Sequence, residues 1–479
     1  MKLNDRVLAL YDVTGIQSYI FQTKKLKDIM GASALVGDAL GDIVRKILGG
    51  HSFPQDALIY SGGGNAIIGF GSCDDWKAFN RTLTRKLMTD VPGLSIVTVC
   101  NEKSGDNNSG EISERVKRLF AEIAKKKVLG GNSCSTCTLS PMAQSGADKM
   151  PISVIEITNE GTEEYSYAGW VKNDWGKREA DKRSEDPKDF DTIAEKPAGY
   201  EDAERLMAVV HIDGNNMGQI FKRAHEQAKS LADITALSVA VSEAFNTAIE
   251  ALWVDDNVET AIPTQSRRMI YHSGDDVTYV CHGIYALNSV IRFMKALEVA
   301  RMGDERIKDL SASAGIAYVK PHFPFYRAYT IAEDCCKAAK NKARIEYSQR
   351  LDFDVGSWVN FEIIRGSDNK GMLGDSYMRP YCIVSPDTRS DKDCHIDKLI
   401  ACLDIVKSGA RSKWKTLRNS YLLGGTESVW LLMKSCNIER PSTVIEEKVV
   451  FDALDLMDVL VPIGTDEQVS GISGQEGAQ

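Results

Sequence analysis

Three aspartates are the residues of this sequence best suited to chemistry. Asp213 ends the β-branched run LMAVVHID, and Asp275 and Asp276 lie in the glycine-bearing turn of RMIYHSGDDVTYVCH. Three converging carboxylates repel one another unless a divalent cation neutralises them, and oxygen ligands alone suit Mg²⁺ or Mn²⁺. Paired metals can activate a hydroxyl and stabilise a leaving pyrophosphate, so the pattern predicts nucleotidyl transfer with these aspartates as catalytic metal ligands. Two acids beside a glycine also occur in ordinary hairpin turns, but Asp213 favours the metal site.

The elements around the aspartates explain why they should meet. The second half of the chain has a strand-like run ending at Asp213, a helical stretch, two strand-like runs joined by the turn, another helix and the strand SASAGIAYV. This β-α-β-β-α-β order is ferredoxin-like. Its first strand is antiparallel to the third, so the carboxyl end of the first lies beside the turn between the second and third. We therefore expect Asp213 next to Asp275 and Asp276.

The first half repeats the same order. VLALYDVTGIQSYIF opens it, ALIYSGGGNAIIGF forms its hairpin, and a helical stretch leads to the strand GLSIVTVC. Aligning the Ile-Tyr pairs of the two hairpins places Gly64 and Asn65 opposite Asp275 and Asp276. The pattern indicates a duplication in which the first copy lost its acids.

Other residues near the aspartates are candidates for binding phosphate. The backbone N–H groups of Gly214, Asn215 and Asn216 precede a helix and can cradle phosphates. The helix in FYRAYTIAEDCCKAAKNKAR carries basic residues at spacings of three and four, which place them on one face either toward a triphosphate or toward solvent. These residues are Lys337, Lys340 and Arg344. Ser273 is a further candidate for placing a hydroxyl near a nucleotide.

The amino-acid composition limits the possible classes of protein. The 479 residues are 43% hydrophobic and 26% charged, which predicts a soluble protein of two or three domains. No run approaches the roughly 18 apolar residues of a membrane span, and nothing at the start resembles a signal peptide, so we expect a cytoplasmic protein without membrane contact. A net charge of −9 argues against a protein wrapped mainly in nucleic acid.

The predicted organisation is α+β, with two ferredoxin-like domains, an intervening cysteine-bearing insertion and a C-terminal, mostly helical domain. Cys134 and Cys137 form a Cys-x-x-Cys pair, which is either part of a structural Zn²⁺ site completed by distant ligands or two free thiols. The predicted boundaries are 1–115 for the first domain, 116–203 for the insertion and linker, 204–352 for the second domain, 353–463 for the helical domain and 464–479 for a disordered tail.

The motifs together resemble the large, palm-domain subunit of type III CRISPR effector complexes. DVTGIQSYIFQTKKLKDIMGASALV is similar to the family's first-palm opening, HIDGNNMGQIF to the second-palm opening, SGDD to the Gly-Gly-Asp-Asp signature, and HFPFYRAYTIAEDCCKAAK to the last palm helix. The resemblance spans most of residues 6–350. It implies conversion of ATP, or another nucleoside triphosphate, to cyclic oligoadenylate-type messengers that a downstream effector reads in antiviral defence.

The resemblance also assigns residues. It implies that Asp213, Asp275 and Asp276 bind the metal, that Ser273 and Gly274 form the turn approaching the nucleotide, and that Lys340 touches phosphate. It further implies that the first palm supplies a pocket for an acceptor nucleotide and does no chemistry. That pocket is formed by Gly62, Gly63, Gly64 and Asn65.

The sequence departs from the family at several points. It has no His-Asp dipeptide of a nuclease domain, so DNA cleavage is not expected, and Ser273 replaces the first glycine of the signature. The short C-terminal part suggests a standalone relative. The alternative is a non-catalytic, nucleotide-binding scaffold within an RNA-guided complex, for which the basic helix around Lys413 and Lys415, with Trp414, is the candidate face for RNA or partner subunits.

Overall fold

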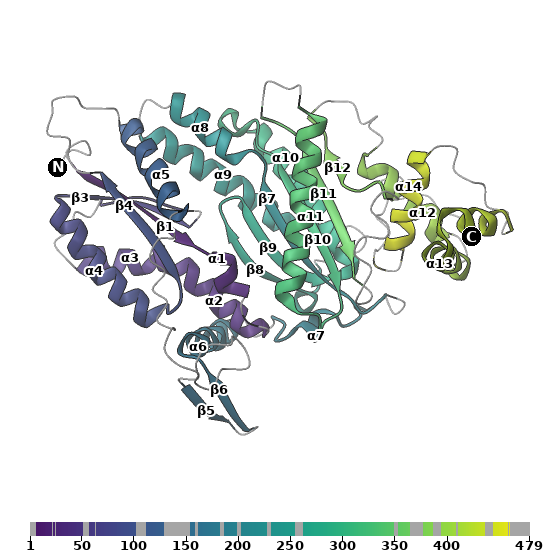
Figure 1. The fold of residues 1–479 in the computed structure, drawn as a ribbon, viewed down its shortest axis with the longest axis horizontal. Coiled ribbons are helices and arrows are strands. Elements are labelled where there is room, and N and C mark those ends of the chain that lie inside the picture. The colour runs from purple at the N-terminus through teal and green to yellow at the C-terminus, as the bar shows by residue number, and fades with distance from the viewer. Residues whose placement is uncertain are drawn as a thin grey trace, which may run out of the picture.

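The structure is a computed structural model with two sheets, helices packed on them, and a C-terminal helical part (Figure 1). The residues it describes are 6–21, 23, 25–50, 57–62, 64–101, 112–128, 154–158, 161–182, 186–198, 203–227, 231–253, 262–348, 353–364, 377–386, 394–408, 411–435, 444–457 and 459. Cys134, Cys137, Gly63 and the predicted tail 464–479 lie outside them. In the described part, no helix is both long and apolar enough to cross a membrane.

The first sheet has the ferredoxin-like strand order β2-β3-β1-β4, with every neighbouring pair antiparallel. Alternate residues of β1 face opposite sides. Leu8 and Leu10 pack against α5, whereas Val7, Ala9 and Tyr11 belong to the core on the other face. The elements are β1 (Val7–Thr14), α1 (Ile16–Phe21), α2 (Leu26–Leu40), α3 (Asp42–Gly50), β2 (Leu58–Gly62), β3 (Asn65–Phe70), α4 (Cys73–Asp90), β4 (Ser95–Asn101) and α5 (Ile112–Val128).

The second sheet, drawn in teal and green in Figure 1, repeats this order and adds two strands: β12-β11-β10-β7-β9-β8. The predicted pair of ferredoxin-like domains is therefore confirmed. The elements are β7 (Met207–Gly214), α8 (Met217–Gln227), α9 (Leu231–Ala251), η2 (Thr264–Ser266), β8 (Arg267–Ser273), β9 (Asp276–His282), α10 (Gly283–Met302), η3 (Glu305–Ile307), β10 (Ala312–Val319), α11 (Phe325–Glu346), β11 (Ser357–Ile363) and β12 (Tyr381–Val384).

The duplication extends to the register of the hairpins. Asp12 pairs with Asn65 on β3, as Asp213 pairs with Asp276 on β9. Both hairpins also have a register shift at the same place, between Leu58 and Tyr60 in the first and between Met269 and Tyr271 in the second. Gly64 and Asn65 therefore occupy the positions of Asp275 and Asp276.

The two halves share one core. The face of the second sheet that carries Met207 and Val209 packs in the same cluster as Phe21 and Leu26 of the first half. The opposite face, with Ala208, Val210 and Ile212, is covered by α9 and α10. The carboxyl end of β7 thus lies at the junction between the halves.

Three predicted boundaries need correction. The boundary at residue 115 falls inside α5, which packs on β1 and β4 and so belongs to the first sheet. The supposed linker contains β5 (Val154–Thr158), β6 (Gly161–Tyr165), α6 (Tyr167–Lys182) and α7 (Phe190–Ile193). The mostly helical part begins only after β11 and β12, whose buried apolar residues extend the second sheet.

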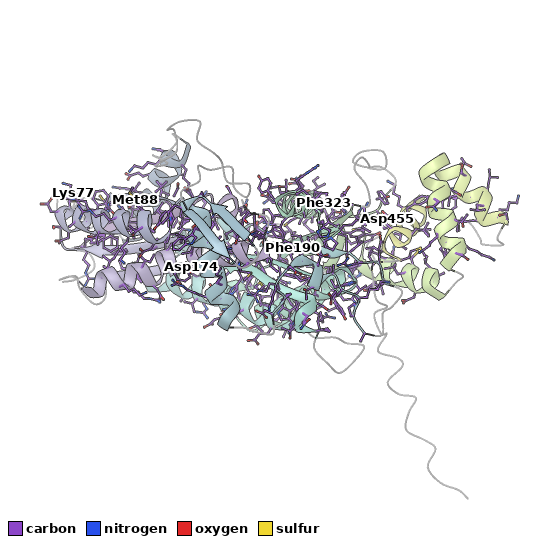
Figure 2. All side chains as sticks on the ribbon, turned by 90° about the horizontal axis from the view of Figure 1, so that it is seen from below. Lys77, Met88, Asp174, Phe190, Phe323 and Asp455 are labelled. Carbon is purple, nitrogen blue, oxygen red and sulfur yellow. The ribbon has the colours of Figure 1, made fainter. Side chains whose placement is uncertain are left out.

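The C-terminal helices are α12 (Ile396–Ser408), α13 (Arg411–Ser435) and α14 (Val444–Leu456). In Figure 2, Lys77 and Met88 of α4 mark one end of the elongated molecule, and Asp455 of α14 lies toward the other. Trp414, on α13, is buried in the core, so it does not present a stacking surface for RNA, whereas Lys413 and Lys415 are exposed.

Candidate functional site: a carboxylate cluster between the two halves

Strand pairing brings the three predicted aspartates together. Asp213, near the end of β7, lies opposite Asp276 at the start of β9, and the Gly214 N–H donates to the Asp275 carbonyl oxygen at 3.2 Å. The Asp213 carboxyl group is also near enough to raise the pKa of Asp275. The turn that allows this contains Gly274 with φ of 61°, a conformation that favours glycine.

Gly214 leaves the space that Asp275 occupies. A Cβ at position 214 would lie 2.8 Å from Asp275 Oδ2 and 2.7 Å from the Met217 side chain. Any larger residue would force the turn and the start of α8 apart. The lack of a side chain at Gly214 therefore allows the acids to pack closely. Its N–H already donates a hydrogen bond to the carbonyl oxygen of Asp275.

Lys340 on α11 supplies the positive charge at this cluster. Its Nζ lies 2.5 Å from Asp213 Oδ2 and 2.8 Å from the Gly214 carbonyl oxygen. The helix lies unusually close to the sheet at Gly315, where a Cβ would stand 1.9 Å from the Ala332 carbonyl oxygen. Close packing of backbone on backbone thus brings Lys340 to the strand end.

One lysine does not balance three acids. Burial, followed by the charge of Asp213, raises the pKa of Asp275 to about 6. Burial and the charges of Asp213 and Asp275 raise the pKa of Asp276 to about 8, although 28% of its side chain is exposed. Three ionised carboxylates and one ammonium would leave two uncompensated negative charges, which is the electrostatic condition for binding a divalent cation.

The donor set fits a hard divalent cation such as Mg²⁺ or Mn²⁺. It consists of carboxylate oxygens, and Asp276 Oδ1 is a buried oxygen with no hydrogen-bond partner. As the side chains stand, no three His, Cys, Asp or Glu groups of the described residues already surround one point in coordination geometry. Cation binding would therefore require Asp213 to turn from Lys340.

One residue that contacts Asp276 was missed from the sequence. His211 Nδ1 lies 3.5 Å from Asp276 Oδ1 and 3.2 Å from Thr278 Oγ1, and burial lowers its pKa to about 4, so it is neutral at pH 7. Its position two residues before Asp213 on a strand was the available signal.

A cavity of about 330 Å³ joins the first-half turn to the second-half hairpin. Gly64 and Asn65 line it together with His272 and Ser273, so the structure brings the predicted acceptor residues next to the turn of the signature. Gly62 pairs with Asn65 beside this cavity, and Gly64 has φ of 76°.

A larger cavity, of about 860 Å³, lies elsewhere at the junction. Its lining includes Phe190 and Phe323, which Figure 2 shows near the middle of the molecule, and none of the residues predicted from the sequence to bind nucleotide. Arg268 borders both cavities and forms an ion pair with Asp186. The smaller cavity is the one relevant to the aspartates, because it contains Ser273 of their turn.

The remaining phosphate candidates are not equivalent. Asn215 is buried, and its side chain bonds to the Gly356 carbonyl oxygen at 3.0 Å and to Ser313 Oγ at 2.9 Å, so it ties β7 to β10 and the start of β11. Arg344 Nε lies 3.3 Å from Asn216 Oδ1, while Lys337 pairs with Glu333 at 2.8 Å. Of the three basic candidates predicted on α11, Lys340 is the one seen to contact an aspartate of the cluster; binding of nucleotide by the others stays a prediction.

Two ferredoxin-like sheets that share a core, with acids at one strand end of the second, define a protein with a duplicated palm-type fold. Residues 206–346 match the family described as Cas10/Cmr2, second palm domain. These residues are thus similar to a Cas10/Cmr2 second palm, and the chain as a whole has a fold similar to that of Csm1 in the solved structures. This confirms the resemblance drawn from the motifs.

Solved structures with a similar fold include the Csm1–Csm4 cassette in complex with pppApApA, at a TM-score of 0.56 and 14% identity, covering 95% of this chain and 70% of that chain. The cassette in complex with cA4 has a TM-score of 0.52 at 15% identity, with the same coverage. Csm1 in T. onnurineus has a TM-score of 0.52 at 15% identity, covering 96% of this chain and 70% of that chain. None of the curated proteins compared with the chain matches it in sequence.

Proposed function

We propose that this protein is a divalent-metal-dependent nucleotidyltransferase that joins ATP, or another nucleoside triphosphate, into cyclic or linear oligonucleotide messengers of CRISPR-type antiviral defence. The observation that carries the proposal is the cluster of Asp213, Asp275 and Asp276, for which Lys340 is the one cationic ion-pair partner found among the described residues. The similar Csm1–Csm4 cassette has been solved in complex with one ATP, cA3 and cA4, which supports nucleotide binding by this fold.

The proposal assigns a different role to each palm. Asp213, Asp275 and Asp276 would hold Mg²⁺ or Mn²⁺, which when bound lowers the pKa of an attacking hydroxyl and stabilises the departing pyrophosphate. Lys340, released from Asp213, would turn toward the triphosphate. The cavity lined by Gly64 and Ser273 would hold the second nucleotide, because it lies between the inactive turn and the acidic turn.

The test is to incubate the purified protein with radiolabelled ATP, and with each other nucleoside triphosphate, in Mg²⁺ or Mn²⁺. Products are resolved by chromatography and mass spectrometry, and pyrophosphate release is followed in parallel. We expect a product that is lost in the Asp275→Asn/Asp276→Asn double variant while its circular dichroism spectrum is unchanged. Unchanged turnover in that folded variant would refute the proposal.

A non-catalytic scaffold remains the second candidate, because Lys340 already neutralises Asp213 in the structure and the acids do not yet converge on one point. In this case the chain would bind nucleotide within a type III complex, with RNA and partner subunits. Copurification of RNA or partner subunits, with no product from any nucleotide even after their addition, would favour the scaffold.

A further inference from the structure

A buried polar pair lies beside the acids of the second palm. His211 and Thr278 are partners on β7 and β9, two residues before Asp213 and two residues after Asp276. His211 Nδ1 forms a hydrogen bond with Thr278 Oγ1 at 3.2 Å and lies 3.5 Å from Asp276 Oδ1. A buried imidazole thus contacts one of the candidate metal ligands.

The first palm has apolar residues at the equivalent positions. Leu10 pairs with Ile67 as His211 pairs with Thr278, and both apolar side chains belong to the cluster that packs against α5. Apolar side chains are therefore enough to fill this place between sheet and helix. Burial of polar groups costs free energy unless hydrogen bonds replace those to water, and such exceptions to an apolar core are expected at functional sites. The polar pair of the second palm indicates a role at the acids.

The imidazole is held in place by α11. The Tyr329 ring packs edge-on against His211, with ring centres 5.4 Å apart and planes at 73°. The same helix carries Lys340, which contacts Asp213. Gly315, the partner of His211 on β10, lets the backbone of α11 approach the sheet. One helix therefore fixes a lysine beside the first acid and a histidine beside the third.

The chemistry of the two contacts differs. Asp213 is paired with the ammonium of Lys340, which competes with any cation for its charge. A neutral histidine donates through one ring nitrogen and orients a carboxylate without cancelling its charge. Beside an ionised Asp276 the proton belongs on Nδ1, because a lone pair there would face the carboxylate. At 3.5 Å the contact is longer than an ordinary hydrogen bond, and a small rotation of the carboxylate would close it.

We infer that His211 is a positioning residue that holds the Asp276 carboxylate in the orientation needed to bind a divalent cation. The inference rests on the metal site of the proposed function and deepens it by assigning the buried residue next to one of the ligands. Thr278 and Tyr329 act by fixing the imidazole. The second palm therefore differs from the first in the support of its acids as well as in the acids themselves.

The experiment measures the Mn²⁺ affinity of the full chain, without nucleotide, by electron paramagnetic resonance titration of free Mn²⁺. His211→Phe keeps a ring against Tyr329 and removes the nitrogen, whereas His211→Asn places an amide nitrogen close to the position of Nδ1. We expect Mn²⁺ to bind about tenfold more weakly to His211→Phe, as is usual when a partner of a metal ligand is removed, and nearly as tightly as wild type to His211→Asn.

Val209→Ala is the matched control, because Val209 is buried on the same face of β7, two residues before His211. It should lower the melting temperature and leave the Mn²⁺ affinity of the folded protein unchanged. The double variant His211→Leu/Thr278→Ile reproduces the apolar pair of the first palm and takes the place of His211→Phe if that variant does not fold, with the same expected loss. Thermal unfolding and circular dichroism establish which variants fold.

A double-mutant cycle distinguishes orientation of Asp276 from a general structural effect. In an Asp276→Asn background, His211→Phe should weaken Mn²⁺ binding little further. The inference would be overturned by wild-type affinity in His211→Phe, by affinity in His211→Asn as weak as in His211→Phe, by an equal loss in Val209→Ala, or by a full additional loss of about tenfold in the Asp276→Asn background.

The same titration separates the inference from the proposed function. A wild-type protein that binds Mn²⁺ but forms no product would contradict the proposed function and leave His211 to be judged by affinity alone. A wild-type protein that binds no Mn²⁺ would overturn both.

Discussion

The two palms have the same arrangement of strands and helices and differ in the charge of one turn. In the first, Asp12 Oδ2 lies 2.5 Å from Lys127 Nζ on α5; in the second, Asp213 Oδ2 lies 2.5 Å from Lys340 Nζ on α11. Each pair thus joins the end of the first strand to the helix after the fourth. Opposite Asp12 stands neutral Asn65, whereas opposite Asp213 stands Asp276. The first palm is balanced by its lysine, and only the second has excess negative charge for a cation.

The largest difference should appear when the equivalent acids are removed one at a time. Asp213→Asn should reduce product formation about 10³-fold or more, because metal-assisted charge stabilisation is worth several kcal/mol. Asp12→Asn should retain most of the activity, since it faces a lysine and no further acid. Rates of pyrophosphate release under saturating Mn²⁺ measure both. Equal losses in the two variants would mean that the first palm is not inactive.

Removing the equivalent lysines should affect the stability of the two palms in different ways. Lys340→Met leaves Asp213 unpaired beside two acids and should lower the free energy of unfolding by about 1–3 kcal/mol, between the values for exposed and buried pairs. Added Mn²⁺ should restore that loss. Lys127→Met should also destabilise, but without rescue by Mn²⁺, because Asp12 stands alone. Thermal unfolding with and without Mn²⁺ tests this, and rescue of both variants would contradict it.

The palms also differ in how closely the lysine-bearing helix approaches its sheet. Strand pairing makes Gly315 equivalent to Val99, since His211 and Leu10 are their partners two residues before the aspartates. Val99 packs by its side chain against α5, whereas Gly315 admits the backbone of α11. The second palm therefore holds the backbone of its lysine-bearing helix directly against the sheet at this position.

Gly315→Ala should move α11 away from its sheet, toward the separation of helix and sheet found in the first palm. The new Cβ would overlap the Ala332 carbonyl oxygen, so α11 must move, at a cost of about 1–3 kcal/mol in the free energy of unfolding. Lys340 moves with it, and the rate of pyrophosphate release should fall. Val99→Ala is the matched control, which should destabilise without changing the rate relative to folded protein. An active, fully stable Gly315→Ala protein would show that the close approach is not required.

The sequence was sufficient for the parts of the site that depend on local pattern and strand order. Alternation, turn residues and the repeated order placed Asp213, Asp275 and Asp276 at one sheet end, and the aligned hairpins placed Gly64 and Asn65 opposite the acids. From the residues alone, Lys340 was recognised only as part of a basic helix face, and it was the resemblance that singled it out. Which of its three basic residues reaches the acids depends on the close packing at Gly315, a tertiary property.

Contacts across the junction could not be predicted from the sequence for the same reason. Phe21 and Leu26 of the first half pack in the same cluster as Met207 and Val209 of the second, and nothing in the spacing of residues reveals how domains pack. The burial of Asn215, which satisfies the end of β7 and not a phosphate, is likewise a consequence of β11. β11 was missed because the pattern after Phe353 was interpreted as mostly helical.

The smallest expected effect is a pH dependence of the stabilisation by Mn²⁺, which we expect from the acids of the second palm. The pKa values of Asp275 and Asp276, about 6 and about 8, lie above the value near 4 expected in the unfolded chain. The folded metal-free protein therefore binds more protons than the unfolded chain between about pH 4 and 8, so these groups make it lose stability as pH rises through that window. Mn²⁺ should thus raise the melting temperature more at pH 8 than at pH 5.5. Asp276→Asn should reduce this difference and Asp12→Asn should leave it unchanged; equal Mn²⁺ stabilisation at both pH values in the wild type would contradict the excess charge assigned to the acidic turn.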